Sequence, residues 1–182
     1  MEITPTGFTD LYILKPKVFN DSRGFFMESY NDLTLQKLGI HFNFCQDNQS
    51  FSKKGVLRGL HFQKDPHAQT KLIRTLEGNI LDVVVDLRKD QPTFKKVFSI
   101  ELSNNNNLQL LVPKGFAHAF VVLSETASVL YKCDAHYDKS SEGGIRFDDP
   151  ELNIDWGIPN DQLILSEKDV KLPLLKNLDF LF

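Results

Sequence analysis

The sequence predicts an all-β domain, built as an antiparallel sandwich or barrel with a few short helices. Seven short runs of apolar or alternating residues lie between residues 55 and 133, spaced by about ten residues with turn residues between them. Helical signals are few, and no long helix alternates with these strands. The phosphate-binding patterns GxGxxG and GxxxxGKS/T are absent, which argues against a Rossmann or P-loop fold.

The predicted strands cover Gly55–Phe62, Lys71–Leu76, Leu81–Leu87, Val97–Leu102, Leu108–Val112, Ala119–Leu123 and Ser128–Cys133. In Leu81–Leu87 one face is wholly apolar, whereas on the other face Asp82 and Asp86 alternate with Ile80 and Val84. Two interpretations of the acidic face stay open. It either lines the interior of a barrel and belongs to a site, or it is exposed to solvent.

Between and around the strands, turn and capping residues predict the short elements. Asn31–Leu38 is expected to form a helix capped by its first or second residue, with Gly39 just past its end. Ser166 is expected to cap a second, very short helix. Asn104–Asn107 is expected to form a turn between strands, because Asn tolerates left-handed backbone conformations.

Length and charge indicate one domain over residues 1–182 and argue against several partner classes. With 21 basic and 24 acidic residues the net charge is −3, so binding to nucleic acid is not expected. The first ten residues have no basic stretch followed by an apolar run, and the longest wholly apolar run is Ala119–Leu123. No signal peptide, membrane span or disulfide framework is therefore expected, and the predicted location is the cytoplasm.

Three segments in the first third of the chain carry polar residues that could bind a ligand. Asp21–Glu28 places Arg23 and Glu28 around an aromatic pair, and it could equally be a surface turn leading into a strand. Gln46–Ser50 is a dense amide cluster, which could read the edge of a nucleotide base or form an ordinary loop.

The third segment, Gly55–Gln63, is the most informative because it carries Arg58 and His61 in an otherwise apolar strand. Either side chain would be costly to bury without a partner. The two have opposite parity, so a regular strand would send them to opposite faces. If both serve one site, Gly59 should mark a bulge or kink that redirects one of them.

Further along, the segment Pro113–His118 has the pattern PxGxxH and ends in a His expected to open the next strand. A lone His of this kind is usually structural, and Tyr131 is more often a core residue with a satisfied hydroxyl. No obvious nucleophile is present. From these residues alone, proton-transfer chemistry and simple binding both remain open.

Taken in order, the segments resemble the dTDP-4-dehydrorhamnose 3,5-epimerase family of the cupin superfamily. The segments are PKVFNDSRGFFMESY, FCQDNQS, GVLRGLHFQ, AQTKLIR, GNILDVVVDLRK, PTF, PKGFAHAFVVLS, LYKCDAHY, EGGIRFDDP, DW and LSEKD. The resemblance implies a double-stranded β-helix (jelly-roll) fold, usually as a homodimer, without metal or organic cofactor. It also implies inversion of C3 and C5 of dTDP-4-dehydro-6-deoxyglucose to give dTDP-4-dehydro-L-rhamnose.

The resemblance further implies roles for four catalytic residues. His61 would be the base, and Asp169 would be the carboxylate that orients it. Tyr131 would be the acid on the opposite face of the sugar, and Lys71 would lie near the developing C4 enolate, without needing a shifted pKa.

Other residues match ligand-contacting positions of the family. The dTDP-sugar would be bound by Arg23, Glu28, Gln46, Asn48, Arg58, Lys71, His118, Glu142 and Lys168. Arginine suits the diphosphate because its planar fork makes paired hydrogen bonds. The stretch from Arg23 to Glu28 is expected to reach the site of the partner subunit, and Asp82 and Asp86 are expected only to support other side chains.

Three rival interpretations remain. The first is an epimerase of the same fold that acts on C3 alone. The second is a metal-dependent cupin using His61, His67 and His118, although the usual HxH pair is missing because Phe62 and Gln63 follow His61. The third is a silent sugar-nucleotide-binding module, which would need no opposed acid and base.

Overall fold

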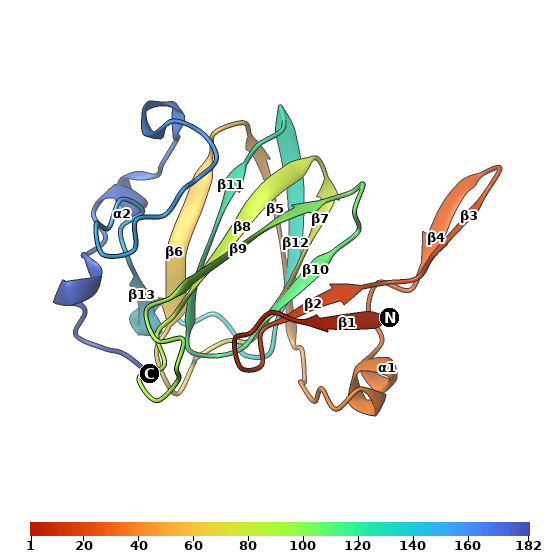
Figure 1. The fold of residues 1–182 in the computed structure, drawn as a ribbon, viewed down its shortest axis with the longest axis horizontal. Helices are drawn as coiled ribbons and strands as arrows, with labels where there is room; N and C mark the ends of the chain where they lie inside the picture. Colours follow the sequence, from red (N-terminus) through yellow and green to blue (C-terminus); the bar gives the residue numbers. More distant parts are fainter.

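The computed structural model describes residues 1–182 and contains two antiparallel sheets that face each other, with a hairpin that projects beyond them (Figure 1). The six-stranded sheet has the order β1 (Glu2–Pro5), β2 (Tyr12–Lys15), β10 (Gln109–Val112), β7 (Lys71–Glu77), β12 (Thr126–Cys133) and β5 (Gln46–Lys53). The five-stranded sheet has the order β13 (Glu142–Gly144), β6 (Leu57–Gln63), β11 (Phe116–Val122), β8 (Asn79–Asp86) and β9 (Val97–Ser103). The projecting hairpin is β3 (Val18–Asp21) and β4 (Gly24–Met27).

The predicted all-β jelly-roll is confirmed, because the chain passes repeatedly from one sheet to the other and all strands pair antiparallel within the sheets. Every predicted strand is present. The largest shift in boundary is at β11, which begins at Phe116 rather than Ala119. His118 therefore lies inside this strand and does not open it, contrary to the expectation from its PxGxxH pattern.

The amide cluster Gln46–Ser50, for which an ordinary loop was one interpretation, is part of strand β5. β5 is an edge strand that pairs with β12 along its whole length. It lacks the apolar alternation of a core strand because polar residues occupy both of its faces. Apolar periodicity, the signal used to find strands, is absent from such a segment.

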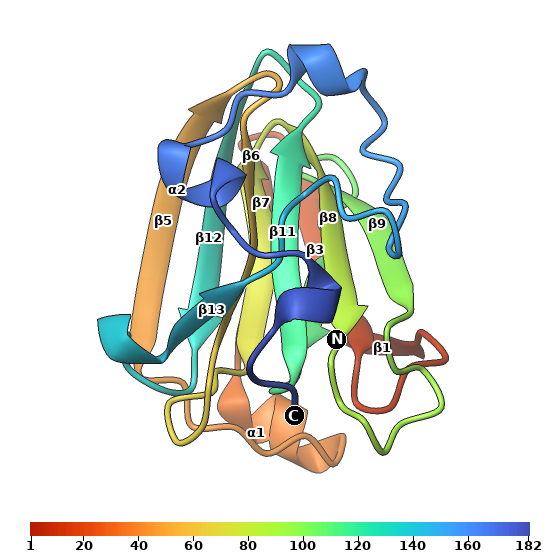
Figure 2. The same cartoon turned by 90° about the vertical axis from the view of Figure 1, so that its left-hand side faces the viewer.

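Two hydrophobic cores lie on the two faces of the five-stranded sheet. One fills the space between the sheets and includes Ile73, Val84, Leu110, Phe120 and Val129. The other covers the outer face, where the C-terminal third of the chain packs (Figure 2). Its apolar residues include Trp156 and Leu175, so the C-terminal segment is held by burial of apolar surface rather than by sheet pairing.

The acidic face of β8 faces the space between the sheets. Its apolar members Ile80 and Val84 belong to the core between the sheets, and both Asp82 and Asp86 are fully buried. The alternative of a solvent-exposed face is therefore wrong. A strand buried on both faces carries two carboxylates, and each must find partners inside the protein.

The predicted helices and turn are present. Helix α1 (Asp32–Lys37) is capped by Asn31, whose side chain accepts a hydrogen bond from the Thr34 amide. Helix α2 (Glu167–Val170) is capped by Ser166. Three 3₁₀ turns span Lys139–Ser141, Asn160–Gln162 and Leu175–Asn177, and Asn104–Asn107 forms the turn between β9 and β10. Neither α-helix has the length and apolar character needed to cross a membrane.

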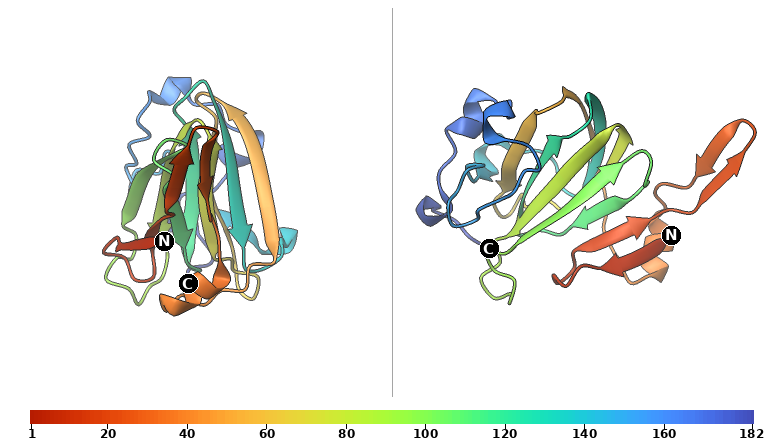
Figure 3. Two further views of the ribbon diagram at one scale, coloured as in Figure 1. Left: turned by 90° about the vertical axis from the view of Figure 1, so that its right-hand side faces the viewer. Right: turned by 45° about the horizontal axis from the view of Figure 1, so that its top comes forward.

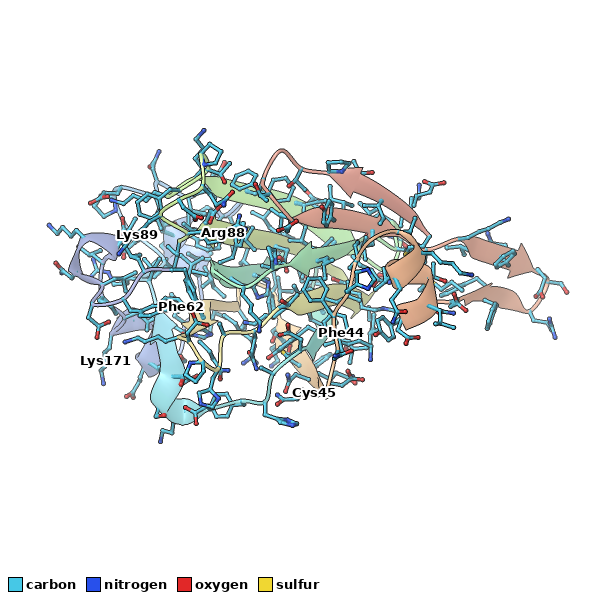
Figure 4. The ribbon with its side chains drawn as sticks, turned by 90° about the horizontal axis from the view of Figure 1, so that it is seen from below. Phe44, Cys45, Phe62, Arg88, Lys89 and Lys171 are labelled. Carbon is cyan, nitrogen blue, oxygen red and sulfur yellow. The ribbon has the colours of Figure 1, made fainter.

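Asp86 fastens the loop that follows β8. Its carboxylate accepts hydrogen bonds from the Arg88 amide and guanidinium at 2.7–3.0 Å and from the Thr93 hydroxyl at 2.6 Å. Arg88, labelled in Figure 4, also donates to the Thr9 carbonyl. Burial alone would raise the pKa of Asp86, but the bonds from Arg88 and Thr93 outweigh burial and hold this pKa below its usual range.

Replacing Asp86 by Asn should lower the free energy of unfolding by about 3 kcal/mol, because Arg88 loses its buried counter-charge. Urea unfolding measures this loss, and Asp90→Asn, at an exposed position in the same loop, is the control. Because the folded-state pKa is lowered, the wild-type advantage should be full above about pH 4 and vanish as the pH falls through that pKa. An advantage that does not change with pH would contradict this interpretation.

Candidate active site

A cavity of about 540 Å³ opens between the two sheets and is closed on one side by the C-terminal segment. Eight of the twelve site residues predicted from the sequence line it, and they come from both sheets and from the region of α2. They are Asn48, Arg58, His61, Lys71, His118, Tyr131, Lys168 and Asp169. The structure therefore brings together residues that lie up to 121 positions apart, from Asn48 to Asp169.

A bulge at Gly59 lets Arg58 and His61 serve the same cavity, as the sequence predicted. His118 of β11 lies opposite His61 and Phe120 lies opposite Arg58, so three steps along β6 match two along β11. Gly59 has a φ of +132°, and an added Cβ would lie 2.6 Å from the Ala119 Cα. Only glycine fits this close approach of two strands.

His61 and Asp169 form a hydrogen-bonded pair at one wall of the cavity. The His61 Nε2 lies 2.6 Å from one Asp169 carboxylate oxygen, and the Ser166 hydroxyl donates to the other at 2.9 Å. Burial would raise the pKa of Asp169, but the hydrogen bond and charge of His61, with the bond from Ser166, keep this pKa below its usual range. Asp169 is therefore an anion that fixes the imidazole ring by its Nε2 atom.

Tyr131 and Lys71 come from the opposite sheet. The Lys71 ammonium lies 5.9 Å from the centre of the Tyr131 ring. Burial is the main cause that raises the pKa of Tyr131, so its hydroxyl remains protonated. Burial likewise lowers the pKa of Lys71, and the charges of Cys133, Asp82 and Glu142 oppose this effect. The sequence analysis required no shift in the pKa of Lys71, and it did not anticipate that this side chain would be buried.

His118 forms a second histidine–carboxylate pair at the cavity. Its Nε2 lies 2.9 and 3.0 Å from the two oxygens of the fully buried Asp82. His118 pairs with His61 in the β6–β11 register. Asp82, expected only to support other side chains, therefore directly contacts a residue that lines the cavity.

Three of the other predicted binding residues, Arg58, Gln46 and Asn48, make side-chain hydrogen bonds at the cavity. The Arg58 Nε donates to the Ser52 hydroxyl at 3.1 Å, and the Gln46 amide donates to Asn48 at 3.0 Å. Gln46 and Glu142 do not line the cavity, but each contacts a residue that does.

Glu142 pairs with Lys168 at 2.7 Å, which joins β13 to α2. This ion pair holds Glu142 beside Lys168, which itself lines the cavity.

Arg23 and Glu28 are not brought to this cavity. Arg23 lies in the turn of the β3–β4 hairpin, pairs only with Asp21 and has 88% of its side chain exposed. The hairpin extends well beyond the two sheets in every view that shows its length (Figures 3 and 4). Within one chain these two residues are separated from the other predicted site residues.

Sequence reasoning missed part of the cavity wall. Ser166 was identified only as a helix cap, yet its hydroxyl also binds the carboxylate of Asp169. The apolar residues Val56, Phe120, Ile164 and Leu165 also line the cavity, and none of them was predicted as a site residue. The pattern of a capping Ser three residues before an acidic residue was the one available signal.

The three histidines considered for a metal site do not come together. His61 and His118 line the cavity, each with Nε2 on a carboxylate, whereas His67 lies in the exposed loop after β6. No group of three or more His, Cys, Asp or Glu side chains is arranged to hold a metal ion.

Comparison with known proteins identifies the family. The family model described as dTDP-4-dehydrorhamnose 3,5-epimerase matches residues 5–177. The chain belongs to the dTDP-4-dehydrorhamnose 3,5-epimerase family. A member from Salmonella typhimurium is 51% identical over 177 residues, which cover 96% of each chain. A crystal structure of the epimerase from Elizabethkingia anophelis superposes with a TM-score of 0.94 at 52% identity, covering 99% of both chains.

Two further solved structures are relevant to the choice between a 3,5-epimerase and an epimerase that acts on C3 alone. The 3,5-epimerase of Legionella pneumophila, solved in complex with dTDP-4-keto-L-rhamnose, has a TM-score of 0.93 at 45% identity and covers 98% of this chain and 94% of its own. A 3′-monoepimerase from Streptomyces bikiniensis has a TM-score of 0.87 at 30% identity, covering 94% and 87%. The predicted family and isomerase class are confirmed.

Gly59→Ala should disrupt the site of this epimerase-family protein, because the new Cβ meets Ala119 and forces β6 and β11 apart. The expected loss is about 1–3 kcal/mol of unfolding free energy, with weaker binding of dTDP as Arg58 and His61 separate. Gly39→Ala is the matched control, since Gly39 also has a positive φ but has no atom within 4 Å of its added Cβ. Equal binding of dTDP by both variants would contradict the proposed role of the bulge.

Proposed function

We propose that the protein inverts C3 and C5 of dTDP-4-dehydro-6-deoxy-D-glucose and so produces dTDP-4-dehydro-L-rhamnose. The observation that carries this proposal is the placement of His61 with Asp169 and Tyr131 on opposite sides of one cavity. Inversion at a carbon requires removal of a proton from one face and delivery to the other. A binding module would need no such opposed pair.

His61 is the proposed base. C3 and C5 both flank the C4 ketone, so loss of either proton gives an enolate whose charge rests on the carbonyl oxygen. Asp169 holds the His61 Nε2, which leaves Nδ1 free to accept the proton. When His61 becomes positively charged, the ionised Asp169 stabilises that charge, so the pair lowers the barrier to proton removal.

Tyr131 is the proposed acid, and Lys71 is the proposed partner of the enolate. The raised pKa of Tyr131 keeps its hydroxyl protonated and able to give a proton to the opposite face of the sugar. Lys71 brings a cationic group to a site shielded from water, where a charge stabilises an enolate more strongly than in bulk solvent.

The nucleotide is proposed to lie toward the open edge of the cavity. Arg58 and Lys168 supply cationic groups for the diphosphate, while Gln46 and Asn48 supply amides for the thymine and deoxyribose. His118 and Glu142 complete the set of substrate-binding residues. The Legionella structure with a bound dTDP-sugar supports this class of ligand.

A homodimer in which each β3–β4 hairpin reaches the site of the other subunit is also proposed. The hairpin exposes Phe19, Phe25 and Phe26, and Phe26 has 70% of its surface exposed. Large apolar side chains on a projecting hairpin are characteristic of an interface with another chain. Such an exchange would carry Arg23 and Glu28 to a cavity that they do not reach in their own chain.

Incubation with dTDP-4-dehydro-6-deoxyglucose in D₂O, with a chelator present, should give deuterium at both C3 and C5 by NMR. His61→Asn should lower this exchange by about 10²–10⁴-fold while leaving the affinity for dTDP within about twofold.

Tyr131→Phe should instead permit exchange without inversion, because His61 can return a deuteron to the face from which it took the proton. Tyr12→Phe, on the outer face of the six-stranded sheet, is the control. Exchange at C3 alone would establish a 3-epimerase, and a fully active His61→Asn would exclude the assigned base.

Co-expression of differently tagged His61→Asn and Arg23→Ala chains tests the exchanged hairpin. Each variant alone should have little activity. A mixed dimer should regain one working site, formed by the body of the Arg23→Ala chain and the hairpin of the His61→Asn chain. Purification through both tags followed by the exchange assay measures this recovery. If the mixed dimer stays as inactive as the parent variants, each hairpin serves its own chain or none.

A further inference from the structure

Gln63 is a buried polar residue at the end of β6 to which the proposed mechanism gives no role. Only 5% of it is exposed, and its side-chain amide is fully engaged with the backbone of two loops. The nitrogen donates to the His67 carbonyl at 2.7 Å and to the His136 carbonyl at 3.2 Å, and the oxygen accepts from the Asp138 N–H at 2.8 Å. Gln63 therefore holds the loop after β12 against the loop after β6.

Tyr137 lies between the two residues of the β12 loop that Gln63 binds, so its backbone is fixed on both sides. The Tyr137 N–H donates to the Gln46 Oε1 at 3.0 Å. A backbone N–H can only donate, so this bond requires the Gln46 amide to face Tyr137 with its oxygen rather than its nitrogen. The loop thus sets the orientation of a side chain on β5.

The same direction of donation continues through two more side chains. The Gln46 Nε2 donates to the Asn48 Oδ1 at 3.0 Å, and the Asn48 Nδ2 in turn donates to the Cys133 Sγ at 3.7 Å. Burial is the main cause that raises the pKa of Cys133 to about 11, so a neutral thiol ends the chain. An amide nitrogen carries two hydrogens, so one N–H of Asn48 is left for the cavity that Asn48 lines.

We propose that Gln63 is a positioning residue for the nucleotide: by fixing the Tyr137 N–H it sets the amide of Asn48, which then presents an N–H to an acceptor oxygen of the dTDP group. This inference rests on the proposed function and identifies what orients one of its binding residues. The phosphates and the thymine carbonyls of dTDP offer many acceptors. An Asn48 amide turned the other way would present its own oxygen to them, so fixing its orientation before binding favours affinity.

Gln69 gives a comparison within the same loop. Its Nε2 donates to the Ala135 carbonyl at 2.8 Å, so it also anchors the loop after β12. This single bond is made two residues before Tyr137, whereas Gln63 holds the residues on either side of Tyr137. Gln69 therefore separates the anchoring of the loop from the control of the N–H that begins the chain.

Gln63→Glu tests the proposal with almost no change in shape. A carboxylate can still accept from the Asp138 N–H, but it cannot donate to the two carbonyls that it would face. The Kd for dTDP, measured by calorimetry at a temperature where circular dichroism shows the variant folded, should rise about 5–20-fold. Gln69→Glu is the control, and its Kd should stay within about twofold of the wild type. An equal rise in both variants would overturn the inference, because anchoring of the loop alone would then explain it.

A double-mutant cycle shows whether Gln63 acts through Asn48. In an Asn48→Ala background, Gln63→Glu should change the Kd for dTDP by less than about twofold, because the amide that it orients is gone. Additive losses would overturn the inference. If Gln63→Glu does not fold, Gln63→Met removes the same hydrogen bonds without adding a charge, and the same results are expected of it.

The side-chain amide signals give a readout that does not depend on turnover. In ¹H–¹⁵N spectra of the free protein, the Asn48 Nδ2 hydrogens should exchange with solvent faster in Gln63→Glu than in the wild type. Identical signals and exchange in both proteins would refute the positioning role. If the wild type binds dTDP but shows no deuterium exchange at C3 or C5, the proposed epimerase function fails, while these amide signals still decide the role of Gln63.

Discussion

The hydrogen bond between His61 and Asp169 is the contact on which the site depends, because it joins the sheet to the C-terminal segment that closes the cavity. The two residues are 108 positions apart, and Asp169 arrives through the packing of that segment on the outer face of the five-stranded sheet. Apolar burial by residues such as Trp156 holds the segment, while Ser166 orients the carboxylate. The position of Asp169 beside His61 therefore rests on a hydrophobic core that lies mostly outside the cavity.

The second constraint is that the two sheets face each other across a space that apolar side chains fill only in part. One end of this space is a closed core, and the other holds ionisable side chains from β6, β7, β11 and β12. Each wall contributes a different kind of group, because a jelly-roll sends alternate strands to opposite sheets. That topology sets His61 and Tyr131 on opposite walls of the cavity.

Burial then sets the electrostatics. It raises the pKa of Tyr131 and lowers that of Lys71, whereas hydrogen bonds from His61 and Ser166 overcome burial at Asp169. Burial thus acts differently on the pKa of each group, depending on the partners that the group finds.

The sequence by itself determined the all-β class, the strands with alternating apolar residues, the capped short helices and the need for a break at Gly59, since these depend on local periodicity and backbone preference. The ordered motifs also predicted the family and eight of the sixteen residues that line the cavity. Only the tertiary structure decided that the acidic face of β8 is buried and that β5 is a strand, because both depend on what packs against them. It also decided that Arg23 and Glu28 lie apart from the cavity of their own chain, since local sequence patterns carry no information about where a hairpin points.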